Sequence, residues 1–159
     1  MLRALFTRAT LTLAAALAVI AWLLPNHVEP WGSFYNEWAM GLALVVACIG
    51  LLAIDRRPIA VPTVAWVPFA LSVLPWAQWA LGLVRFRGDA LLSSLYLLGL
   101  GAAIVAGARW RQVRGEAAAV SVQTVVVIGA LASAFVAFVQ WQQLDWLGLF
   151  VADLPQLAR

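Results

Sequence analysis

Charged residues are scarce in this sequence. Asp, Glu, Lys and Arg make up only 11% of the 159 residues, whereas 65% are hydrophobic. A soluble globular domain is about a quarter charged, so the composition excludes that class. It also excludes an intrinsically disordered chain, which combines low hydrophobicity with high net charge. Most of the chain is therefore expected to be surrounded by lipid and not by water.

Lysine is absent and cysteine occurs once. All 10 basic residues are arginines, in short clusters between apolar stretches, a spacing typical of membrane topology signals and not of a nucleic-acid-binding face, although the net charge is +3. The single cysteine, Cys48, excludes an internal disulfide and a cysteine metal site and is expected to be a buried core residue. The sequence has no serine nucleophile elbow, phosphate loop or metalloprotease motif. We therefore predict no metal site and no cofactor in this chain.

Long uncharged runs dominate the sequence instead. A helix of about 20 residues crosses a hydrocarbon core of about 30 Å, and backbone groups in lipid must be satisfied within the helix. Five runs predict such helices, and we place the spans at residues 9–26, 36–54, 61–82, 90–108 and 118–140. Pro62, Pro68 and Pro75 are expected to bend the third span or break it near its ends. The predicted fold class is an all-α integral membrane protein.

The distribution of arginine predicts the orientation of these spans. Arg3, Arg8, Arg56, Arg57, Arg109, Arg111 and Arg114 lie on one side, and Arg85, Arg87 and Arg159 on the other. By the positive-inside rule, the N-terminus is cytoplasmic and the chain crosses the membrane five times. No ionisable side chain lies in the middle of a span, which disfavours a proton-driven or ion-coupled transporter.

Small residues recur every four positions in two of the spans. They are Gly99, Ala103 and Gly107 in the fourth span, and Gly129, Ser133 and Ala137 in the fifth. Because small residues at this spacing let two helices approach closely, we expect the fourth and fifth spans to pack on each other.

Two loops predicted to lie outside the cytoplasm carry most of the polar residues. The first, residues 25–37, holds His27, Glu29 and Glu37. The simplest interpretation is a proline-stiffened loop anchored at the lipid headgroups, since His27 and Glu29 alone are too few ligands for a metal site. The second loop, residues 82–89, holds Arg85 and Arg87, whose forked donors suit phosphate or diphosphate oxygens. In the alternative interpretation, Asp89 pairs with one arginine and a lipid phosphate binds the other.

The first loop resembles a known signature. It is similar to the N-terminal region of bacterial protein O-oligosaccharyltransferases, the PglL-type glycosylation ligases of the O-antigen ligase and polymerase superfamily. The residues that carry this resemblance are Pro25, Asn26, His27, Pro30, Trp31, Phe34 and Glu37. It continues through Arg57 and Pro58 ahead of Pro62, residues 78–82 and 86–90, and Gln140, Trp141 and Gln142.

The resemblance implies a multi-pass protein of the bacterial inner membrane. Such an enzyme transfers an oligosaccharide from undecaprenyl pyrophosphate to Ser or Thr of periplasmic proteins or pilin. The implied partners are the lipid-linked oligosaccharide donor, the acceptor protein and the lipid bilayer, with no nucleic acid. Arg85, Arg87, His27 and Glu37 become candidate substrate-binding residues.

The resemblance also implies that the essential histidine of the family lies in a later loop, so His27 is not that residue. Residues 1–159 are then expected to be an N-terminal transmembrane module, a fragment of a larger polytopic protein. The catalytic C-terminal part is not in this chain, and the segment alone is expected to be inactive. Two alternatives stay open: an O-antigen ligase or polymerase with a sugar acceptor, and a small membrane scaffold protein without catalysis.

Overall fold

The described part of the structure is built from helices. This computed structural model describes residues 2–24, 34–54 and 58–142, and no strand occurs among them. Four helices are long and apolar enough to cross a membrane: α1 (Leu2–Leu23), α2 (Phe34–Ile54), α5 (Arg87–Arg114) and α6 (Glu116–Trp141). Three shorter elements lie between α2 and α5: the 3-10 helix η1 (Thr63–Ala65), α3 (Trp66–Leu71) and α4 (Leu74–Ala80). The predicted all-α membrane fold class is confirmed.

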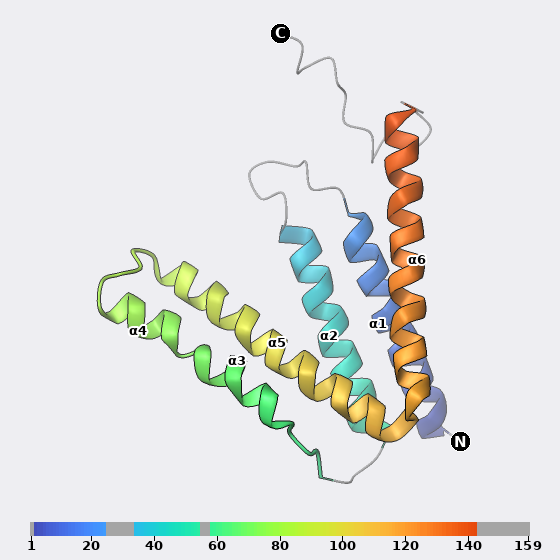
Figure 1. Cartoon of the computed structure of the whole chain (residues 1–159), viewed down its shortest axis with the longest axis horizontal. Helices are drawn as coiled ribbons and strands as arrows, with labels where there is room; N and C mark the ends of the chain where they lie inside the picture. The colour runs from blue at the N-terminus through green and yellow to red at the C-terminus, as the bar shows by residue number, and fades with distance from the viewer. Residues whose placement is uncertain (1, 25–33, 55–57, 143–159) are drawn as a thin grey trace.

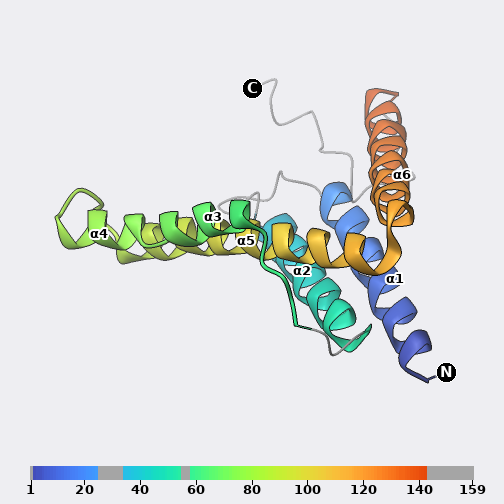
Figure 2. The same cartoon turned by 60° about the horizontal axis from the view of Figure 1, so that its bottom comes forward.

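The helices form two groups that diverge from each other. In the first group, α1 and α2 lie antiparallel and α6 runs beside α1 (Figure 1). In the second group, η1, α3 and α4 run back along α5, and this group projects away from α1, α2 and α6 (Figure 2). Since α5 also packs on α2, it connects the two groups.

The α1–α2 pair is held by a close helix contact and by a hydrogen bond at one end. A Cβ atom at Gly50 would collide with the side chain of Thr10, so the glycine allows α2 to approach α1. At the other end, the Asn36 side-chain amide donates a hydrogen bond to the Leu24 carbonyl oxygen, at 3.0 Å. Cys48, which the sequence places in the core, is only partly buried in α2.

The third predicted span, residues 61–82, is not one continuous helix. It divides into η1, α3 and α4, with a break at Ser72 and Val73 between α3 and α4. Pro75 follows the break at the second position of α4, where its missing N–H is not required. The Ser94 hydroxyl of α5 donates a buried hydrogen bond of 2.7 Å to the Ser72 carbonyl oxygen. The break is therefore satisfied by a side chain from the neighbouring helix, as a discontinuous membrane helix requires.

The small residues of α5 and α6 do not pack against each other as the sequence suggested. A Cβ atom at Gly129 would collide with the Trp22 ring of α1, so α6 packs on α1 through this glycine. A Cβ atom at Gly99 would lie 3.9 Å from a methyl group of Leu44 in α2. The two helices diverge after the turn at Gly115 in both views (Figures 1 and 2). The expected packing through these glycines is not found, because the indole ring of α1 meets Gly129 and the leucine of α2 lies near Gly99. Helices α5 and α6 contact each other in part.

Candidate functional site

The structure describes only some of the predicted site residues. Phe34 is the first residue of α2, and Glu37 lies in the first turn of that helix. Arg85 and Arg87 lie at the turn between α4 and α5, with Arg87 at the start of α5. The remaining signature residues, Pro25, Asn26, His27, Pro30 and Trp31, lie outside the described residues.

Residues 78–82, part of the family resemblance, form the end of α4. Gly82 has a φ of 74°, a left-handed conformation that glycine adopts without a Cβ penalty. The Gly82 N–H donates to the Trp79 carbonyl at 3.0 Å, and the Leu83 N–H donates to the Gln78 carbonyl at 2.9 Å. This pair of bonds is a Schellman motif. The motif therefore ends the helix at a fixed point and directs the chain toward Arg85.

Arg87 joins α4 to α5. Its guanidinium carbon lies 5.8 Å from the centre of the Trp76 ring in α4, within the range of a cation–π interaction. The Trp76 ring in turn meets the Trp79 ring edge to face, with the ring centres 6.2 Å apart. Arg87 thus stabilises the hairpin formed by the two helices.

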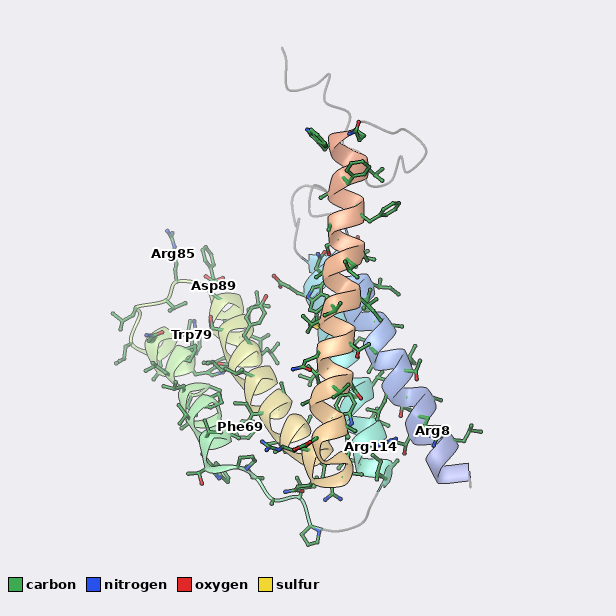
Figure 3. The ribbon with its side chains drawn as sticks, turned by 45° about the vertical axis from the view of Figure 1, so that its right-hand side comes forward. Arg8, Phe69, Trp79, Arg85, Asp89 and Arg114 are labelled. Atoms are coloured by element: carbon green, nitrogen blue, oxygen red, sulfur yellow. The ribbon has the colours of Figure 1, made fainter. Side chains whose placement is uncertain are left out.

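Arg85 faces outward from the same turn. Its guanidinium carbon lies 5.8 Å from the ring of its neighbour Phe86, and its side chain points away from α4 and α5 (Figure 3). Within residues 58–142, Asp89 forms no ion pair with Arg85 or Arg87, so the interpretation in which Asp89 neutralises one of them is not supported. The turn presents one outward guanidinium with its donors available.

The surroundings of Arg85 are apolar. The exposed fractions of Leu81, Leu83 and Phe86 are 76%, 73% and 63%. Apolar side chains beside an arginine are typical of a lipid interface, where the apolar groups enter the acyl region and the guanidinium reaches phosphate. This cluster of Leu81, Leu83, Arg85 and Phe86 is called the arginine turn below.

Glu37 lies on a different helix from the arginines. It is in the first turn of α2, whereas Arg87 starts α5, and these two helices pack against each other.

Two residues of this region were missed from the sequence: Trp76 and Ser94. Trp76 was hidden among other tryptophans, and Ser94 follows another serine in the sequence. Sequence spacing alone does not show which of them faces a neighbouring helix.

The two ends of α5 carry different groups. Figure 3 places Arg8 of α1 and Arg114 of α5 at one end of the molecule, and Arg85 and Asp89 at the opposite end of α5. The side chain of Arg109, near the C-terminal end of α5, is buried. In the described ranges, no group of three or more His, Cys, Asp or Glu could hold a metal ion.

Comparison with known proteins identifies a relative. No family model matches the chain, and no solved structure matches it. The chain is similar to a general O-oligosaccharyltransferase from Acinetobacter baylyi, with 31% identity over 138 residues. The match covers 85% of this chain and 24% of the relative, so the chain spans about a quarter of the relative's length. The match supports a relationship to O-oligosaccharyltransferases.

Proposed function

We propose that this chain is the N-terminal membrane segment of a glycan ligase in the bacterial inner membrane. The ligase transfers an oligosaccharide from undecaprenyl pyrophosphate to Ser or Thr of a periplasmic protein or pilin. The observation that carries this proposal is the similarity to an O-oligosaccharyltransferase over 85% of the chain. The four membrane-length helices support it. In this proposal the segment alone does not catalyse transfer.

The chemistry of such a donor defines what the protein must supply. The diphosphate is already a leaving group, so catalysis requires stabilisation of its negative charge and a base near the acceptor hydroxyl. Arg85 suits the first task, because its forked donors face outward beside apolar side chains. We assign donor binding to Arg85 and a structural role to Arg87, whose guanidinium already lies over Trp76. His27 and Glu37 stay candidates through their place in the signature.

The test is glycan transfer with purified lipid-linked donor and acceptor, using the protein as its gene encodes it. A charge-assisted hydrogen bond contributes about 1.5 to 3 kcal/mol, so Arg85→Ala should lower kcat/KM by roughly ten- to a hundredfold. Arg85→Lys keeps the charge and loses the fork, so its rate should fall between wild type and Arg85→Ala.

Leu83→Ala is the matched control for this experiment. Leu83 is an exposed side chain of the same turn without a charge, so its loss should leave kcat/KM within about twofold of wild type. Wild-type kinetics for Arg85→Ala, at equal amounts of folded protein, would remove Arg85 from the donor site.

A further inference from the structure

We propose that one face of α6, around Gln123, is a docking surface for a membrane helix from the part of the ligase that follows residue 159. In this proposal the Gln123 carboxamide forms a hydrogen bond with a polar group of that helix. The inference rests on the proposed function, in which this chain continues into further membrane segments. It concerns how the parts of the ligase assemble and not how the donor is bound.

Gln123 is a polar side chain inside a membrane-length helix. It lies seven residues after Glu116, the first residue of α6, which corresponds to about 10 Å along the helix. The side chain is exposed, and within the described residues it forms no hydrogen bond. Lysine and arginine can reach the headgroups from such a depth, but the glutamine side chain is shorter. Because a carboxamide in lipid without a partner is costly, Gln123 requires a partner from elsewhere.

The polar residues next to Gln123 differ from it. The Ser121 hydroxyl donates to the Ala117 carbonyl oxygen at 2.8 Å. The Thr124 hydroxyl donates to the Val120 carbonyl oxygen, also at 2.8 Å. Both hydroxyls are satisfied within α6, so they can face lipid without another helix. Gln123 is therefore the polar group of this stretch that points to a missing neighbour.

Gln123 does not face α1, the helix on which α6 packs. Successive residues of an α-helix lie about 100° apart around its axis. Gln123 is therefore about 120° around α6 from Gly129, which meets Trp22 of α1, and about 160° from the buried Val139. The Gln123 face is defined below by four exposed residues on this side of the helix: Gln123, Val127, Ala130 and Ala134.

A later membrane helix of the same ligase is the occupant that these observations favour. The match to the O-oligosaccharyltransferase covers 24% of that relative, so about three quarters of its length lie outside the match. Helices that follow one another in a chain usually pack as neighbours, and α6 is the last helix that the structure describes. Membrane helices associate through hydrogen bonds of Ser, Thr, Asn, Gln and His side chains and through close packing at small residues. The carboxamide of Gln123 supplies the first of these, and Ala130 and Ala134 leave room for close packing.

The first measurement is photo-cross-linking in native membranes, with the protein as its gene encodes it. Benzoylphenylalanine is placed at Val127 in one variant and at Ile128 in another. The two residues have similar exposed fractions, 55% and 52%, but Ile128 lies about 100° around the helix from Val127 and off the Gln123 face. We expect the Val127 variant to give an adduct with the mass of a single chain, whose cross-linked peptide comes from beyond residue 159. The Ile128 variant is the matched control and should give no such adduct.

Other occupants of the Gln123 face would give different products. An adduct with twice the mass of the chain would mean that a second copy covers this face. An adduct with lipid alone, or with residues 1–159 of the same chain, would mean that no later helix covers it. Each of these results overturns the proposal. An equal yield from the Ile128 variant also overturns it, because the contact would not be specific to the Gln123 face.

The second measurement is thermal unfolding of the full-length protein with Gln123→Leu. If Gln123 binds a later helix, leucine leaves a polar group of that helix unsatisfied, and Tm should fall by about 2 to 4 °C. If Gln123 faces lipid, leucine removes a costly polar group, so an unchanged or higher Tm would overturn the proposed hydrogen bond. Thr124→Val is the matched control. Because the Thr124 hydroxyl is satisfied within α6, this variant should leave Tm unchanged.

These results can be told apart from a failure of the proposed function. If the wild-type protein transfers glycan but the Val127 variant gives no adduct beyond residue 159, the docking surface is overturned and the proposed function stands. If that adduct forms but the wild-type protein transfers no glycan from the purified donor, the proposed function is overturned and the contact of α6 stands.

Discussion

Two neighbouring serines of α5 have different surroundings. Ser94 is buried and donates to the Ser72 carbonyl oxygen at the break between α3 and α4, whereas Ser93 is exposed. We predict that Ser94→Ala lowers the free energy of unfolding by about 1 to 3 kcal/mol, because it leaves a buried carbonyl without a donor.

Thermal unfolding in detergent, followed by tryptophan fluorescence, checks this prediction against Ser93→Ala. The control should unfold within about 0.5 kcal/mol of wild type, as exposed substitutions usually do. Equal stability of the two variants would mean that the break does not depend on Ser94.

Arg87 differs from Arg85 in what its guanidinium contacts. We predict that Arg87→Ala lowers the free energy of unfolding by about 0.5 to 1 kcal/mol through loss of the cation–π contact with Trp76. Transfer per folded molecule should be retained, and Arg87→Lys should recover part of the stability because it keeps the charge. Parallel measurements of unfolding and of glycan transfer show whether Arg87 stabilises the fold or binds the donor. A loss of turnover as large as that of Arg85→Ala, at wild-type stability, would show that both arginines bind the donor.

At the scale of an element, α5 contains a matched pair of glycines. A Cβ atom at Gly101 would collide with the Phe69 ring of α3, whereas a Cβ atom at Gly107 would have no heavy atom within 4 Å. We predict that Gly101→Ala lowers the free energy of unfolding by about 1 to 3 kcal/mol, because it overpacks the contact between α3 and α5. Gly107→Ala should be neutral or stabilising by up to about 1 kcal/mol, because alanine favours the helix.

Phe69→Leu tests the contact between Phe69 and Gly101 from the other side. Combined with Gly101→Ala it should recover part of the lost stability, since the smaller side chain leaves room for the added methyl group. Denaturation of the single and double variants gives the coupling between the two positions. A double variant that loses the sum of the two single effects would contradict the packing of α3 against α5 through this glycine.

The sequence predicted the elements better than their contacts. Composition and run length predicted five spans, and four of them are membrane-length helices in the described residues, because lipid requires such runs to be helical. The prolines of the region 61–82 each lack a backbone N–H, so they predict that a helix there is bent or broken. The positions of Pro62, Pro68 and Pro75 do not show that the break falls at Ser72 and Val73. The position of the break depends on Ser94, a residue of another helix.

The same limit applies to the candidate site. Arg85 and Arg87 are equivalent in the sequence, because each is an arginine in a short loop. The structure distinguishes them through Trp76, which lies eleven residues before Arg87 and on another helix. The small-residue spacing of α6 predicted a close helix contact, and one is found at Gly129. Its partner is Trp22 of α1 and not a residue of α5. Periodicity shows that a helix has a small face without showing which neighbour fills it.

At the scale of the whole molecule, the predicted topology can be checked with reporter fusions. The N-terminus is predicted to be cytoplasmic, with residues 61–82 crossing the membrane although they form a broken helix. Reporters fused after Trp31, Arg87 and Asp153 should be active outside the cytoplasm, and those fused after Arg57 and Arg114 inside. A cytoplasmic signal at Arg87 would mean that α3 and α4 enter and leave on the same side.

The contact between α6 and α1 has a consequence for how the protein is made. Gly129 lies 107 residues after Trp22 in the chain, whereas the α1–α2 pair and the group of α3, α4 and α5 each form from neighbouring segments. During synthesis, the α1–α2 pair and the group of α3, α4 and α5 therefore leave the ribosome before α6, the helix that packs on α1. Local contacts form early, and contacts between distant segments form late. The edge of the Trp22 ring that lies against Gly129 stays uncovered until residue 129 has been made, so the first helix to be synthesised is among the last to be fully packed.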